Sequence, residues 1–393
     1  MKKLCMALAG VVLATGAFAD NTSFHVSNRL RLGYDDNLWL RSSDKTDSFR
    51  IVDELSLQLN VVLKTTYLSV DYTPAATWYD ERKDDEFDVY HNLTVNFLQD
   101  LGERLTLDVA DTLRAGRLPE LYDDNGYIVR EDNDNYFNST RASLMFKLTP
   151  ETRLDLSGRY MFLTYDDDEL HRYDNYDSWV AGLTLRHLFP SRTTGFVDFR
   201  YQQLMYDHSP ENFNRDSDTI FGGVGLEQTF SRNFIGTLRG GVQQRVYDDD
   251  KLFDDQTQPY VEGSLTFLPG ANSLTRFTFT ASYSISESDI SSYLSQERTA
   301  FSLSAAHEFT KRIGAFVSAS YAHGEYDADY SLGKSLPGID EDTYTVSARL
   351  SYKIAERNWL ELNYQFLKLD SDSKARESYS DNRVDLAWKI QLF

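Results

Sequence analysis

Short turns recur along this chain at intervals of about 40 residues. They follow large apolar residues separated by 41, 41, 38, 41 and 45 positions: Leu148, Phe189, Phe230, Leu268, Phe309 and Ile354. Roughly midway between them, a tyrosine is followed by aspartate and other polar residues, at Tyr165, Tyr206, Tyr247 and Tyr326. Short and long connections therefore alternate, and each period is predicted to be one β-hairpin. An antiparallel barrel that crosses a bilayer has this pattern, because its periplasmic turns are short and its outer loops are long.

Apolar and polar residues alternate within each half-period, as in a β-strand with two different faces. Between residues 274 and 287, one face consists of Phe277, Phe279, Ala281, Tyr283 and Ile285, whereas the other is polar. The alternating segments run about 12–14 residues. That exceeds the ~5–6 of a typical soluble strand and suffices for the ~9–11 that cross hydrocarbon. We therefore expect the apolar face to contact lipid and the polar face to line an interior.

The alternation predicts eighteen strands, with sixteen as the alternative because the pattern is weakest over 24–62 and 104–140. The predicted ranges are 24–34, 49–62, 66–79, 87–98, 104–115, 135–148, 152–165, 177–189, 193–206, 218–230, 234–247, 257–268, 274–287, 298–309, 313–326, 341–354, 358–369 and 380–393. An even number places both termini at the short-turn end, as in outer-membrane barrels. The predicted fold class is an all-β, transmembrane, antiparallel up-and-down β-barrel.

The first 19 residues have the features of a secretory signal peptide. Two lysines precede an apolar stretch, residues 4–18, and the motif AFA is a small-x-small cleavage site before Asp20. We expect export through the Sec pathway, removal of residues 1–19, and one outer-membrane barrel domain over residues 20–393. The only cysteine, Cys5, lies in the segment predicted to be removed, so the mature chain is expected to lack disulfides.

The composition argues against two classes of function. The chain has 61 acidic and 40 basic residues, with a net charge of −21, whereas nucleic-acid binding needs a basic surface. Its seven histidines show no metal-ligand spacing, and neither a nucleophile motif nor a phosphate-binding glycine loop occurs. The sequence therefore predicts no enzyme activity, no catalytic residue, no metal and no cofactor. Acidic loop clusters are expected to be solvated, with divalent cations that bridge lipopolysaccharide as the alternative.

The segment Leu30–Leu40, LRLGYDDNLWL, resembles the first strand and loop of outer-membrane β-barrel porin families of the type found with exopolysaccharide gene clusters. In its strand pattern, the whole mature chain is similar to these families. The resemblance implies an outer-membrane barrel with a transport role and carries over no catalytic residue.

The chain ends in Phe393. A terminal aromatic on an alternating strand resembles the signal by which the barrel-assembly machinery recognises outer-membrane barrels. Phe393 falls one residue out of register with the apolar face that ends at Leu392, so either a bulge restores the register or the two residues share the role.

Six arginines are expected to face the lumen, on strands between residues 152 and 247: Arg153, Arg159, Arg186, Arg200, Arg239 and Arg245. One interpretation is that they form ladders with inward acids such as Asp155, Asp198 and Glu262, which stiffen the wall. The other is a basic, pore-lining stripe that guides anionic or sugar-like solutes, because inward charges set the selectivity of a water-filled barrel.

The longest loop, residues 116–134, follows the fifth predicted strand. If it folds into the lumen, as the third loop of general porins does, then Glu120, Asp123 and Asp124 form a constriction opposite the arginines. Otherwise it is a surface loop.

The predicted function is a porin-like channel for passive diffusion of small hydrophilic solutes. An exporter of an extracellular polysaccharide and a non-conducting structural or adhesive barrel are the alternatives. The expected partners are outer-membrane lipid, lipopolysaccharide and the assembly machinery, together with small solutes or polysaccharide. The sequence does not distinguish monomer from trimer, because lipid-facing and subunit-facing apolar residues look alike.

Overall fold

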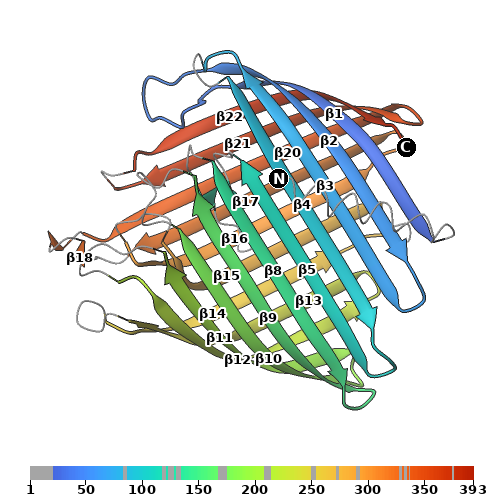
Figure 1. Ribbon diagram of the computed structural model, residues 1–393, viewed down its shortest axis with the longest axis vertical. Helices are drawn as coiled ribbons and strands as arrows, with labels where there is room; N and C mark the ends of the chain where they lie inside the picture. Colours follow the sequence, from blue (N-terminus) through green and yellow to red (C-terminus); the bar gives the residue numbers. More distant parts are fainter. Residues whose placement is uncertain are drawn as a thin grey trace.

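Eighteen long antiparallel strands form one closed barrel in a computed structural model of the chain (Figure 1). The structure describes residues 21–82, 86–116, 121–122, 128–129, 134–166, 175–207, 214–248, 254–270, 274–288, 293–326, 330–331, 334–335, 337–373 and 376–393. Within these ranges, no helix is long and apolar enough to cross a membrane.

The barrel strands are β1 (Thr22–Asp35), β2 (Ser48–Val62), β3 (Thr66–Tyr79), β4 (Phe87–Asp100), β5 (Leu105–Gly116), β8 (Asn135–Lys147), β9 (Thr152–Tyr165), β10 (Tyr176–Phe189), β11 (Thr193–Tyr206), β12 (Ser217–Ser231), β13 (Phe234–Tyr247), β14 (Gln256–Phe267), β15 (Thr275–Glu287), β16 (Ser295–Glu308), β17 (Ile313–Tyr326), β20 (Ile339–Ala355), β21 (Asn358–Ser371) and β22 (Tyr379–Gln391). Two short hairpins lie in the long connections, β6 (Leu121–Tyr122) with β7 (Ile128–Val129), and β18 (Tyr330–Ser331) with β19 (Lys334–Ser335).

The prediction of eighteen strands is confirmed, and the alternative of sixteen is wrong. β3, β9, β11, β13 and β17 have the predicted bounds, and the other strands differ from theirs by at most three residues at either end. Each long strand pairs with the next one along the chain. The last pairing, from Ser27↔Gln391 to Asp35↔Arg383, joins β1 to β22. Closure gives each long strand a neighbour on both sides, which a bilayer requires because hydrocarbon offers no hydrogen-bond partners.

The register assigns each residue to one of two faces, since directly opposed residues of an antiparallel pair point the same way. Leu183, Val197 and Val224 are 43%, 58% and 62% exposed, and their registers place them on one outward face. The arginines and serines that alternate with these apolar residues along the strands face inward. The predicted separation into a lipid face and a polar interior is therefore present in the barrel.

Glycines on β12 and β13 make room for aromatic rings that lie along the inner wall. A Cβ on Gly225 would lie 2.2 Å from the Phe196 ring, and one on Gly223 would lie 2.1 Å from the Tyr260 hydroxyl. At Gly241 the nearest atom is backbone, because an added Cβ would lie 2.1 Å from the Gly222 carbonyl oxygen. Both aromatic side chains are almost fully buried, and their close fit therefore depends on the glycines.

The pairing of β14 with β15 ends early, at Val261↔Tyr283. Leu268 donates its backbone N–H to the carbonyl of Asn233, which precedes β13. Successive residues of a strand direct their N–H groups to opposite neighbours, so the odd-numbered residues of β14 face β15. Beyond Val261, the next odd-numbered residue toward the start of β14 is Pro259, and proline has no N–H to donate. The ladder therefore stops where its next donor is missing, while β15 stays paired with β16 up to Glu287↔Ser295.

We expect Gly241→Ala to destabilise the barrel by about 1–3 kcal/mol, because the added methyl group meets backbone rather than a movable side chain. The control is Gly222→Ala, where a Cβ has no heavy atom within 4 Å. The measurement is the temperature at which the folded band disappears in heat-modifiable gel migration. Equal temperatures for the two variants would contradict the packing described here.

Candidate functional site in the barrel lumen

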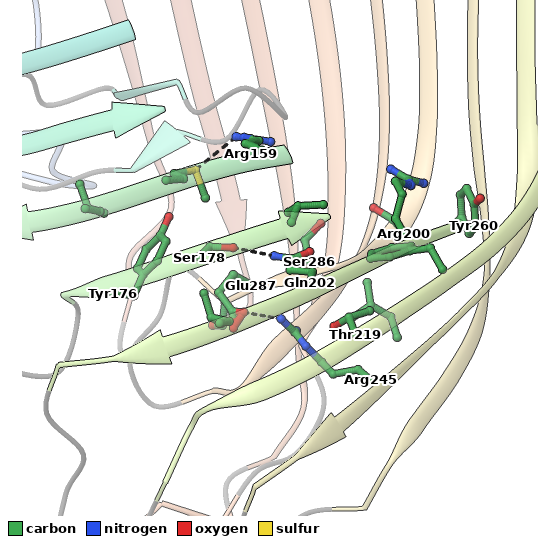
Figure 2. Close-up of a pocket in the computed structure, with 18 of the residues that line it drawn as sticks. Arg159, Tyr176, Ser178, Arg200, Gln202, Thr219, Arg245, Tyr260, Ser286 and Glu287 are labelled. Atoms are coloured by element: carbon green, nitrogen blue, oxygen red, sulfur yellow. Dashed lines mark hydrogen bonds and ion pairs between the residues drawn. The ribbon is translucent and has the colours of Figure 1, made fainter. Parts of the chain in front are cut away.

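A cavity of about 440 Å³ lies inside the barrel, within the ~300–1,000 Å³ range of small-molecule sites. Its walls are the inward faces of β8 to β14 and the end of β15. Figure 2 shows Arg159, Arg200 and Arg245 among polar and aromatic residues such as Gln202 and Tyr260. The cavity therefore combines cationic, hydrogen-bonding and apolar surface.

Two of the predicted arginines form a compact network with two acids. Arg200 lies 3.2 Å from Asp198 and 3.5 Å from Glu262, and Arg239 lies 3.7 and 3.5 Å from the same carboxylates. The Arg200 guanidinium also stacks over Phe221 and Tyr260, with its carbon 4.6 and 5.1 Å from the ring centroids. Ion pairs and cation–π contacts together hold these arginines against the wall while leaving them partly exposed to the lumen.

Arg159 lies on β9, nearer the long-loop end than Arg153. Its Nε donates to Ser139 Oγ at 3.2 Å and one of its Nη atoms contacts Met161 Sδ at 3.2 Å. Arg141 on β8 lies directly opposite Arg159 in the register and also lines the cavity. In the described part of the chain Arg141 has no carboxylate partner. Like charges directly opposed across a strand pair repel.

Arg153 and Arg186 lie nearer the short-turn end and do not line the cavity. They share Asp155, at 2.7 and 3.0 Å, and Arg186 stacks over Phe196 with 4.8 Å to the centroid. These two arginines form the acid-paired ladder of the first interpretation. Arg159, Arg200, Arg239 and Arg245 are brought together around the cavity, although β12, which lies among their strands, contributes glycines instead of an arginine. Their part in a conducting path stays a prediction.

The end of β15 enters the lumen. Five consecutive residues, Ser284 to Ser288, line the cavity, whereas a strand within the wall exposes only alternate residues to one side. Glu287 reaches across β14 to Arg245 on β13 and forms an ion pair of 2.6 Å (Figure 2). In the described ranges, Glu287 is thus an acid that directly faces the arginine wall, the cavity-lining set of Arg159, Arg200, Arg239 and Arg245. The predicted constriction residues Glu120, Asp123 and Asp124 lie outside the described residues.

Three residues at this site escaped the sequence analysis. By alternation, Glu287 belongs to the outward face of Tyr283 and Ile285. The only sign in the sequence that it faces the lumen was its charge, at the end of an otherwise apolar face. Arg215 lies in a connection rather than a strand, and donates to the Tyr206 hydroxyl at 3.1 Å. Arg141 carries the correct alternation, but its strand lay in a weakly patterned stretch.

Among the described residues, Asp216 and Asp248 lie at the rim of the barrel opposite the short turns. Asp248 directly follows β13, and its backbone N–H donates to the carbonyl of Asp216 at 3.1 Å. Burial raises the pKa of the Asp248 carboxyl above its ordinary value, and the negative charges of Asp216 and Asp218 raise it further. Within the described ranges, no group of three or more His, Cys, Asp or Glu is arranged to hold a metal ion.

At the other end, β22 stops at Gln391 and the last two residues continue beside β1. Leu392 donates its backbone N–H to the Val26 carbonyl at 2.7 Å, and the Phe393 N–H donates to the same oxygen at 3.3 Å. This shared acceptor is the irregularity that accommodates the change of register. The Phe393 side chain is 71% exposed, and its role as an assembly signal stays a prediction.

Several solved outer-membrane proteins have a similar arrangement of the chain. OccK2 (OpdF) of Pseudomonas aeruginosa in complex with glucuronate is 11% identical and covers 96% of this chain and 100% of its own, with a TM-score of 0.49. OpdK of the same organism with vanillate is 11% identical and covers 95% of this chain and 100% of its own, with a TM-score of 0.49. OccAB3 of Acinetobacter baumannii is 13% identical, with the same coverages and a TM-score of 0.47. Identities this low concern the fold alone.

No curated protein matches the sequence significantly. The model of one protein family, described as "Putative beta-barrel porin 2", matches residues 23–392. The match spans the barrel from β1 to the end of β22 and agrees with the resemblance noted at Leu30–Leu40. The chain therefore belongs to this family of β-barrel porins of the outer membrane.

Proposed function

We propose that this porin is a passive channel for small hydrophilic solutes and that its wall favours anions. The observation that carries the proposal is the charge of the lumen between β8 and β13. There the inward basic residues are Arg141, Lys147, Arg153, Arg159, Arg186, Arg200, Arg239 and Arg245, whereas the inward acids are Asp155, Asp198 and Glu227.

An excess of positive charge in a narrow lumen concentrates anions, because low-dielectric walls focus the field there. The net charge of −21 has the opposite sign, and acids such as Asp216 and Asp248 lie at the rim. The rim therefore opposes anion entry while the wall favours it. In this proposal the wall governs selectivity, because the cavity is the confined part of the path.

The test is single-channel recording of the refolded barrel in a planar bilayer with a salt gradient. We expect steady open steps and a reversal potential of the sign that indicates anion preference. A folded barrel that remains silent would overturn the diffusion channel and favour polysaccharide export or a structural role.

Replacing Arg200 and Arg239 by glutamine should shift the reversal potential toward cation preference, because Asp198 and Glu262 then lose their counter-charges. The matched control replaces Arg312 and Arg357, which lie in short turns outside the lumen strands, by glutamine. This control removes the same charge and is expected to keep the wild-type reversal potential. An unchanged potential in the Arg200/Arg239 variant would exclude those side chains from the conducting path.

We also propose that residues 1–19 are removed on export. N-terminal sequencing of the protein from outer-membrane fractions should begin at Asp20, and Ala19→Arg should slow processing because the cleavage site needs a small residue there. A mature protein that begins at Met1 would contradict this proposal.

A further inference from the structure

We propose that the lumen holds a binding site for small polyhydroxylated solutes, namely sugars and their derivatives, in a second cavity lined by hydroxyl groups of β15 and its neighbours. This inference rests on the proposed function and deepens it, since it names the class of solute that the channel binds. The arginine wall acts through its charge, whereas this site recognises hydroxyl groups.

The second cavity has a volume of about 490 Å³ and lies against the inward faces of β13 to β16. Six of the described residues that line it carry a hydroxyl group: Thr237, Ser264, Thr280, Ser282, Ser284 and Ser286. Among these lining residues no apolar side chain is larger than that of Ala281, whereas Met161 and Leu204 line the first cavity. The second cavity is therefore suited to a solute that is polar on every side.

The strand register arranges the polar groups of this cavity in two neighbouring rows across β13, β14 and β15. One row consists of Thr237, Ser264 and Thr280. The next inward row on the same strands consists of Arg239, Glu262 and Ser282. Neighbouring strands lie about 4.8 Å apart, and alternate residues of one strand lie about 6.8 Å apart. Several of these groups can therefore contact one small solute at the same time.

The hydroxyl groups on β15 are available to a solute. In the part of the chain that the structure describes, Ser282, Ser284 and Ser286 make no side-chain hydrogen bond, and all three are half-buried. A hydroxyl group beside a water-filled space binds water when it has no partner in the protein. A sugar hydroxyl can replace that water, because it also donates and accepts hydrogen bonds.

Charged groups beside these hydroxyls supply both donors and an acceptor. The two cavities meet at five residues that line both of them: Arg200, Arg239, Glu262, Ser284 and Ser286. The Glu262 carboxylate lies 3.5 Å from each guanidinium, and its side chain is 44% exposed, so it can also accept a hydrogen bond from a solute. Sugar hydroxyls need donors and acceptors together. The site therefore fits a sugar better than a simple anion, which the carboxylate repels.

The experiment records the single-channel ion current of the full barrel while glucose is added to both sides of the bilayer. We expect a saturable decrease in current, because glucose that is bound in the path obstructs the ions. The control solute is tetraethylene glycol, which has a similar mass but carries hydroxyl groups only at its ends. It should decrease the current in proportion to its concentration, without saturation.

Variants test the hydroxyl groups themselves. Ser282→Ala combined with Ser284→Ala should raise the glucose concentration at half-saturation about tenfold, because hydrogen bonds to the solute are lost. Ser282→Thr combined with Ser284→Thr keeps the hydroxyls and should retain the saturable decrease. The matched control is Ser318→Ala with Ser320→Ala, which removes inward hydroxyls of β17 that line neither cavity and should behave as wild type. Heat-modifiable migration confirms that each variant folds.

The outcomes separate this proposal from the proposed function. If the channel prefers anions but glucose and tetraethylene glycol affect the current alike, the sugar site is overturned and the proposed function stands. An unchanged half-saturation in the Ser282/Ser284 alanine variant would overturn the sugar site as well. A cation-preferring channel with a saturable, serine-dependent glucose effect would support the site and overturn the anion preference. A barrel that is folded and silent would overturn both proposals.

Discussion

Backbone hydrogen bonding in a solvent that offers none is the constraint on which this structure depends. Hydrocarbon satisfies no N–H or C=O group, so strands can cross it only when every ladder is paired and the sheet closes on itself. Eighteen strands meet this condition through the joint of β1 with β22. The pairing of β14 with β15 is the exception, because Pro259 removes a donor inside the ladder. Beyond the end of this ladder, the ion pair of Glu287 with Arg245 links β15 to β13 across β14.

The same constraint explains why charge collects inside. With one face of each strand committed to lipid, charged residues on the strands gather on the inward face and near the strand ends. Asp53 and Asp111 are exceptions on the outward face, and each accepts a hydrogen bond from a neighbouring asparagine, Asn28 and Asn138. Lumenal arginines then need partners that hold them without neutralising them all. The network of Arg200, Arg239, Asp198 and Glu262 achieves this with long ion pairs and with aromatic rings seated on glycines. The arginine wall and the glycine positions on β12 are therefore parts of one packing arrangement.

The strand ranges were predictable because a lipid-facing surface must be apolar at every second residue over about ten positions. Inward placement of Arg159, Arg200, Arg239 and Arg245 followed from the same alternation. Glu287 was not predictable in this way, since alternation assigns it to the outward face of Tyr283. Its true position depends on which neighbour the backbone nitrogen of Pro259 faces, and that is a property of the register between β13, β14 and β15. Arg215 acts from a connection, where no periodicity indicates direction.

A lumenal ion pair differs in energy from an ion pair in a dry core. In a dry core, breaking one partner from a buried pair is strongly unfavourable because the other charge stays unsolvated. At the edge of a water-filled lumen, both Glu287 and Arg245 can regain hydration when they separate, which offsets much of the lost attraction. The Arg245–Glu287 pair therefore contributes less to the stability of the barrel than its 2.6 Å separation alone would indicate.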